Sequence, residues 1–99
     1  MNEQFEKLQK WYLSQCDEDW EHTYGVEIKT LDNPGWILRI DISDTELEGI
    51  IMQRSIIERS EIDWIQYEVT GDKFVSCGGA LNLAEMVDVF LRIAEADKS

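Results

Sequence analysis

Residues 24–42 read YGVEIKTLDNPGWILRIDI, and this stretch decides the fold. Apolar and polar side chains alternate from Tyr24 to Thr30 and again from Trp36 to Ile42, as in strands with one buried face. The run Asp32-Asn33-Pro34-Gly35 between them is typical of a turn. Asp and Asn bond their own backbone, Pro fixes φ and Gly permits positive φ. The stretch therefore predicts an antiparallel hairpin.

A second hairpin is predicted further along the chain. Residues 64–70 alternate, Gly71-Asp72 forms a turn, and a strand follows over 73–77 until Gly78-Gly79 ends it. Residues 43–60 are harder to interpret, because Leu47, Ile50, Ile51 and Met52 could continue a helix or begin an irregular strand. We expect a loop through Gly49 and then a strand from about Met52 to Arg59.

Helical spacing marks both ends of the chain. From Asn2 to about Cys16, an apolar stripe contains Phe5, Leu8, Trp11, Tyr12 and Cys16. We expect Asp17 to His22 to form a loop, because acids at a helix C-terminus oppose the helix dipole. Asn82, three residues before Glu85, opens the last helix in capping-box spacing. Its apolar stripe contains Leu83, Met86, Val87, Phe90, Ile93 and Ala94.

These elements predict an α+β fold, in which an antiparallel sheet of about four to five strands is flanked by an N-terminal and a C-terminal helix. The helices should cover one face of the sheet or its edges. With 99 residues, 43% hydrophobic and 10% aromatic, we expect residues 1–99 to form one domain around one core. An exposed edge strand could pair across a dimer, but the sequence gives no register for it, so the oligomeric state stays open.

Charge is the strongest feature of the composition. The chain carries 21 Asp and Glu against 9 Lys and Arg, a formal net charge of −12. Nucleic acid and anionic membrane surfaces repel such a chain, so neither is expected as a partner, whereas a basic protein attracts it. The excess charge could equally serve solubility alone. With no signal pattern, no apolar run of membrane-spanning length and only two cysteines, we expect a cytoplasmic protein.

Little in the sequence favours catalysis or a cofactor. Cys16 and His22 lie close together, but a nucleophilic thiolate needs a cation or a helix N-terminus, and Cys16 lies at a helix C-terminus among carboxylates. One His and two separated Cys do not form a standard zinc site. The acids of residues 17–21 lack the spacing of a calcium loop. We therefore expect no enzyme, no metal and no cofactor.

The tryptophans divide into two pairs. Trp11 and Trp36 lie on apolar faces and are expected in the core. Trp20 and Trp64 are flanked by acids, which is the pattern of an aromatic anchor for a basic partner. A tryptophan half-buried beneath a charged loop would have the same sequence pattern.

Several motifs resemble the bacterial immunity protein 53 family. They are Trp11-Tyr12, Ser14-Gln15-Cys16-Asp17, Asp19-Trp20-Glu21-His22, Tyr24-Gly25, residues 30–36, Ile40-Asp41, Glu58-Arg59-Ser60-Glu61, Asp63-Trp64, Lys73-Phe74, Gly78-Gly79 and Asn82-Leu83. The resemblance covers nearly the whole chain and is weakest between Ile42 and Ile57. It implies a protein that binds and neutralises a cognate toxin domain of a polymorphic toxin system.

A toxin that attacks nucleic acid is typically basic, so an acidic inhibitor can be steered to it. We therefore expect a basic, nuclease-type toxin that contacts Asp17, Glu18, Asp19, Trp20, Glu21, His22, Glu61, Asp63 and Trp64. The alternative is an acidic adaptor or nucleic-acid mimic that acts on a partner other than a toxin. Gene neighbourhood and the identity of the partner would distinguish the two.

Overall fold

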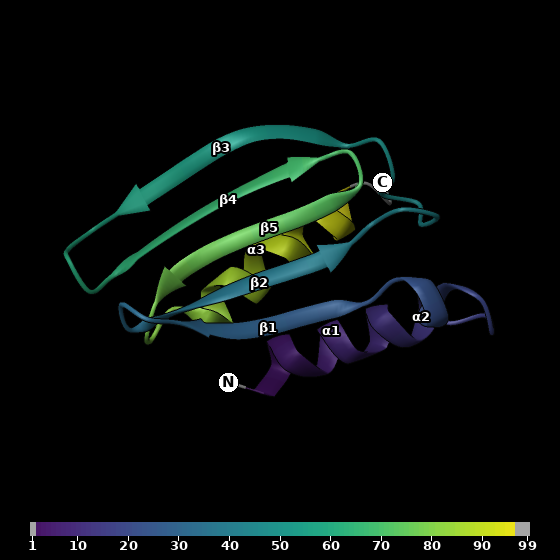
Figure 1. Cartoon of the computed structure of the whole chain (residues 1–99), viewed down its shortest axis with the longest axis horizontal. Coiled ribbons are helices and arrows are strands. Elements are labelled where there is room, and N and C mark those ends of the chain that lie inside the picture. The colour runs from purple at the N-terminus through teal and green to yellow at the C-terminus, as the bar shows by residue number, and fades with distance from the viewer. Residues whose placement is uncertain (1, 97–99) are drawn as a thin grey trace.

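A computed structural model describes residues 2–96 of the chain (Figure 1). Two long helices and a five-stranded sheet make up most of it. The elements follow in the order α1 (Asn2–Gln15), α2 (Trp20–Thr23), β1 (Val26–Leu31), β2 (Gly35–Asp41), β3 (Ile51–Glu58), β4 (Trp64–Thr70), β5 (Lys73–Gly79) and α3 (Leu83–Ala96). This arrangement confirms the predicted α+β class.

The sheet has the strand order β1-β2-β5-β4-β3, and every neighbouring pair is antiparallel. Both predicted hairpins are present. They are joined side by side through β2 and β5, in a register that places Gly35 opposite Gly79 and Asp41 opposite Lys73. The predicted strand after Gly49 is also present as β3, which pairs with β4 at the edge of the sheet.

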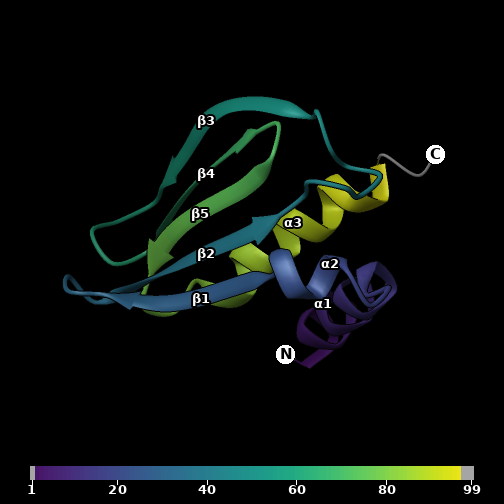
Figure 2. The same cartoon turned by 45° about the vertical axis from the view of Figure 1, so that its right-hand side comes forward.

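The two long helices lie on one face of the sheet, and the other face is uncovered (Figure 2). α3 contacts β5, β2 and β4, and α1 packs against α3. Inward-facing residues of the central strands, such as Leu38, Ile40 and Phe74, are at most 1% exposed. The core between the layers consists of Leu8, Trp11, Trp20, Leu38, Ile40, Ile42, Leu47, Ile65, Val69, Phe74, Met86, Val87, Phe90, Leu91 and Ala94.

The structure corrects two details of the sequence interpretation. Trp20–Thr23 forms a helical turn within the expected loop of residues 17–22. Asp17, one of the acids that oppose the end of α1, also begins α2, because its carboxylate accepts hydrogen bonds from the backbone N–H groups of Asp19 and Trp20. In α1 the buried stripe is centred on Leu8 and Trp11, whereas Tyr12 is 39% exposed.

No helix among residues 2–96 combines the length and the apolar character that crossing a membrane requires.

Candidate functional site

Two acids hold the connection between α1 and α2 in shape. The Asp17 carboxylate accepts hydrogen bonds from the backbone N–H of Asp19 at 3.0 Å and of Trp20 at 2.9 Å. The Glu21 carboxylate accepts from the N–H of Asp17 at 3.0 Å and of Glu18 at 2.9 Å. Hydrogen bonds from the backbone N–H groups of Trp20 and Asp19 lower the pKa of Asp17. Backbone hydrogen bonds to the Glu21 carboxylate, of which its own N–H has the largest effect, lower the pKa of Glu21. Both acids therefore stay ionised and fix the loop.

The other acids of this loop point to solvent. Glu18, Asp19 and His22 are exposed, and neither the Glu18 nor the Asp19 carboxylate has a hydrogen bond or ion pair to residues 2–96. Glu18 has φ 78°, a left-handed conformation that is unfavourable for a side chain of this kind. The loop thus presents Glu18 and Asp19 from a fixed backbone.

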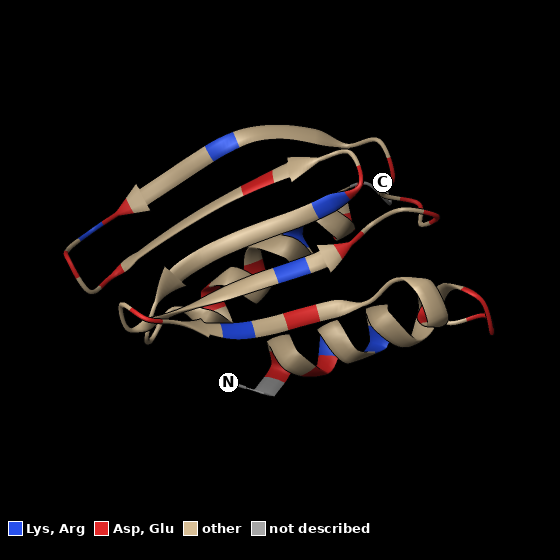
Figure 3. Ribbon diagram, in the orientation of Figure 1, with Lys and Arg blue, Asp and Glu red and all other residues tan. Residues whose placement is uncertain are grey.

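Two further loops meet this one at the same end of the sheet. The Trp20 indole Nε1–H donates to the Ser43 carbonyl at 2.9 Å, which joins α2 to the β2–β3 loop. The N–H groups of Ile42 and Gly49 donate to the carbonyls of Asp72 and Gly71, which joins that loop to the β4–β5 turn. Figure 3 shows the acids gathered there. We call this surface the acidic end; its exposed carboxylates are Asp17, Glu18, Asp19, Asp44, Glu46, Glu48 and Asp72.

Sequence reasoning missed four members of the acidic end: Asp44, Glu46, Glu48 and Asp72. These acids stand in the sequence beside the ends of predicted strands. The strand order shows that those strand ends lie at one edge of the sheet, and the strand order was not predicted. Some of them stabilise their own loops, since the Glu48 carboxylate accepts from the N–H of Asp44 at 2.6 Å. Asp44 and Glu46 make no side-chain hydrogen bond or ion pair to the described residues.

The flanking acids had suggested that Trp20 is an exposed anchor for a partner. In the structure, Trp20 lies in the core. It is 4% exposed, and its ring contacts Trp11 edge to face at 6.0 Å between centroids. Its indole N–H is bonded to Ser43. The flanking Asp19 is exposed and Glu21 is partly exposed, because α2 is a single turn that directs Trp20 inward and its neighbours outward.

The remaining predicted site residues lie at the opposite end of the sheet. Glu61 is exposed, and Trp64 is half-buried at the start of β4. The seven-residue strands separate this end from the acidic end by about 20 Å. The structure therefore does not bring Asp17–His22 together with Glu61, Asp63 and Trp64.

Asp63 belongs to an ion-pair cluster at that opposite end. Its carboxylate accepts from Arg59 Nε at 3.0 Å and Nη2 at 2.9 Å, and from Asn82 Nδ2 at 2.9 Å. Arg59 Nη2 also donates to Glu85 at 2.6 Å. Arg59 and then Asn82 lower the pKa of Asp63. These bonds fasten the β3–β4 loop to the start of α3.

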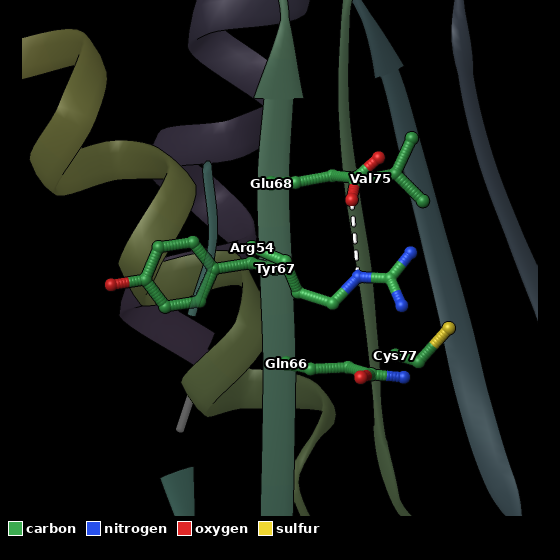
Figure 4. A pocket seen from close by; sticks show the side chains of 6 residues that line it. All are labelled: Arg54, Gln66, Tyr67, Glu68, Val75 and Cys77. Atoms are coloured by element: carbon green, nitrogen blue, oxygen red, sulfur yellow. Dashed lines mark hydrogen bonds and ion pairs between the residues drawn. The ribbon is translucent and has the colours of Figure 1, made fainter. Parts of the chain in front are cut away.

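The uncovered sheet face has a shallow hollow lined by Arg54, Gln66, Tyr67, Glu68, Val75 and Cys77 (Figure 4). Its volume of about 50 Å³ is far below that of a small-molecule site. Burial raises the pKa of the Cys77 thiol, which disfavours the reactive thiolate. The Cys16 thiol donates to the Tyr12 carbonyl at 3.3 Å. Across residues 2–96, no three His, Cys, Asp or Glu side chains are grouped so as to hold a metal ion.

Comparison with known proteins gives one match. No curated protein and no solved structure matches the chain. A family model described as Immunity protein 53 matches residues 5–95, which is nearly the whole sequence. The family of immunity proteins implies a cognate toxin as the partner. The chain therefore belongs to the Immunity protein 53 family, and its function is that of an immunity protein.

Proposed function

We propose that this protein neutralises a basic, nuclease-type toxin domain by binding it through the acidic end. The observation that carries the proposal is the meeting of exposed carboxylates from three separate loops on one surface. The protein acts as a stoichiometric inhibitor in the cytoplasm of the producing cell and not as a catalyst.

The acidic end supports this proposal because its charges are presented by a fixed backbone. Bonds to Asp17, Glu21 and Glu48 hold the loops in the unbound protein, so little ordering entropy is lost on binding. Glu18, Asp19, Asp44 and Glu46 are the carboxylates that face a partner, with His22 beside them as a polar contact. A row of fixed carboxylates steers a basic protein and occupies the sites at which that protein holds phosphates.

The distance between the two ends of the sheet decides which residues belong to one contact. Glu61, Asp63 and Trp64 lie about 20 Å away, and the Asp63 carboxylate is already bonded to Arg59 and Asn82. We therefore place the principal contact at the acidic end and assign Asp63 to the stability of the fold.

A binding experiment tests the partner class. The protein serves as bait in lysate of its own host, and the recovered protein is identified, expressed as a purified domain and assayed for nuclease activity with and without equimolar inhibitor. We expect a basic domain whose nuclease activity is lost in the complex and whose association slows as salt rises. A recovered protein without toxic activity would favour the adaptor or mimic alternative.

A charge-removal variant tests the contact surface. Glu18→Gln with Asp19→Asn removes two presented charges and leaves Asp17 and Glu21 in place to hold the loop. We expect association with the purified toxin domain to slow several-fold at low salt and to depend less on salt, as measured by stopped-flow or surface binding kinetics. The matched control, Glu6→Gln with Asp32→Asn, removes two exposed charges elsewhere. Equal rates for the two variants would exclude the acidic end.

A further inference from the structure

β3 is an edge strand with unusual apolar exposure. It is last in the strand order and pairs with β4 alone. Ile51, Ile56 and Ile57 are 74%, 63% and 39% exposed. Proteins normally protect such an edge with charges, prolines or short strands, because its unpaired backbone groups accept another strand. This eight-residue strand has no proline, and its single bulge lies between Met52 and Ser55.

The hydrogen bonding to β4 shows which residues face the open edge. The Arg59 N–H donates to the Asp63 carbonyl at 2.9 Å. Bonded pairs alternate along an antiparallel ladder, so Ile57 and Ser55 also direct their backbone groups toward β4. Ile56 and Glu58 therefore direct theirs toward solvent. A second antiparallel strand must place its own solvent-directed residues opposite these.

Charge limits what this edge can bind. A two-fold contact brings the same surface patch of both copies together. In a chain with a net charge of −12, most patches would therefore repel their own copy. β3 differs, because Arg54 and Glu58 are its two charged residues and their charges cancel. The edge is thus both apolar and neutral in an acidic molecule, which suits a second copy of this chain.

We propose that two copies associate by antiparallel pairing of β3 with β3, centred on Ile56. This register places Arg54 of one copy opposite Glu58 of the other, twice in the dimer, and Ile56 opposite Ile56. Centring the pair on Ser55 leaves both charges opposite apolar residues, and centring it on Ile57 leaves Arg54 opposite Ser60 and Glu58 opposite Ile56. Centring it on Arg54 opposes two cations. Cross-strand pairs of opposite charge and of β-branched residues stabilise antiparallel sheets, and like charges destabilise them.

The side chains at this edge can make the contact. Arg54 lies over the uncovered face and donates through Nε to Glu68 at 3.1 Å (Figure 4). It is 61% exposed, so it can turn toward the edge and use its Nη groups. Glu58 is exposed and makes no ion pair within residues 2–96. At the opposite edge, the Glu27 carboxylate of β1 is already bound by Arg39 at 2.7 Å and Lys29 at 3.7 Å.

Sedimentation velocity at micromolar concentration and low salt tests the proposal. We expect the wild-type chain at twice its 11.6 kDa mass. Arg54→Glu and Glu58→Arg should each raise the dimer dissociation constant by about tenfold, because each dimer then opposes like charges twice. An equimolar mixture of the two variants should recover the dimer, since every opposed pair is again of opposite charge.

Controls separate pairing from folding and from toxin binding. Ile56→Lys should give a monomer, whereas Ile51→Lys, on a similarly exposed isoleucine of the same strand outside the paired segment, should leave the dimer intact. Circular dichroism checks that each variant is folded. A monomeric wild type, or a mixture of variants that does not recover the dimer, would overturn the proposal. The experiment contains no toxin, so its result is independent of the proposed function.

Discussion

The burial of Trp20 explains why a residue flanked by acids is structural. Its ring contacts Trp11, Tyr24 and Tyr12 at 6.0 to 6.1 Å between centroids. We expect Trp20→Ala to lower the free energy of unfolding by about 3–5 kcal/mol, because a large cavity forms and the Ser43 carbonyl loses its donor. Urea denaturation followed by circular dichroism measures the loss.

Leu13→Ala is the control for this change, because Leu13 is 70% exposed on α1. It should alter the free energy of unfolding by less than about 0.5 kcal/mol. A stable Trp20→Ala protein with weakened toxin binding would return Trp20 to the role of an anchor.

Single residues of the site were only partly predictable from sequence. The acids around Trp20 were identified, but their sequence is the same whether the ring points inward or outward. The direction is set by one helical turn, in which Asp17 caps the N–H groups of Asp19 and Trp20. That turn depends on the Ser43 carbonyl, which is distant in sequence and therefore left no local signal.

Local elements were predicted well because their signals are local. The alternation of apolar and polar residues, with the Asp32–Gly35 turn, was sufficient to predict the first hairpin. The Gly71-Asp72 turn, in which Gly71 has φ 99°, was sufficient to predict the second. The pairing of β2 with β5 was not predicted, because its residues are far apart in sequence and periodicity carries no information about partners. This pairing orders the strands and so determines which acids share the acidic end.

The β3–β4 loop passes so close to Gly79, at the end of β5, that this position requires a residue without a side chain. A Cβ there would lie 2.4 Å from the Ile62 carbonyl oxygen and 2.7 Å from Asn82 Oδ1. We expect Gly79→Ala to lower the free energy of unfolding by about 1–3 kcal/mol, because backbone must move. Gly25→Ala is the matched control, since a Cβ at that position meets no atom within 4 Å. Equal chemical denaturation midpoints for the two variants would contradict this interpretation.

Paired charges and excess negative charges lie on different surfaces of the molecule. The uncovered sheet face holds Arg39, Arg54, Lys29 and Lys73, each paired with an acid of the same face. The excess acids therefore lie on loops and helices, where water screens them. We therefore expect the acidic end to direct association with a basic partner, while the neutral β3 edge remains suited to another copy.

Acid should act on the whole molecule in two opposing ways. As pH falls toward the sequence pI of about 4.2, the self-repulsion of the −12 charge decreases and stability should rise. The folded-state pKa values of Asp17, Glu21, Glu27 and Asp63 are lowered. Their stabilisation is complete above the unfolded pKa values of about 4 and is lost as pH falls through the folded values. The free energy of unfolding should therefore pass through a maximum and fall below about pH 4.

Asp63→Asn isolates one of these carboxylates. Arg59 favours the ionised form of Asp63 in the folded protein, so the neutral amide should destabilise the fold at pH 7. At pH values below the folded pKa of Asp63, the wild-type carboxyl is itself neutral and the difference between the two proteins should shrink. Urea denaturation of both proteins from pH 7 to pH 2 measures this convergence. Parallel curves over the whole range would show that the Asp63 charge contributes nothing to stability, and that the β3–β4 loop is held by the uncharged contacts of Asn82 and Gly79.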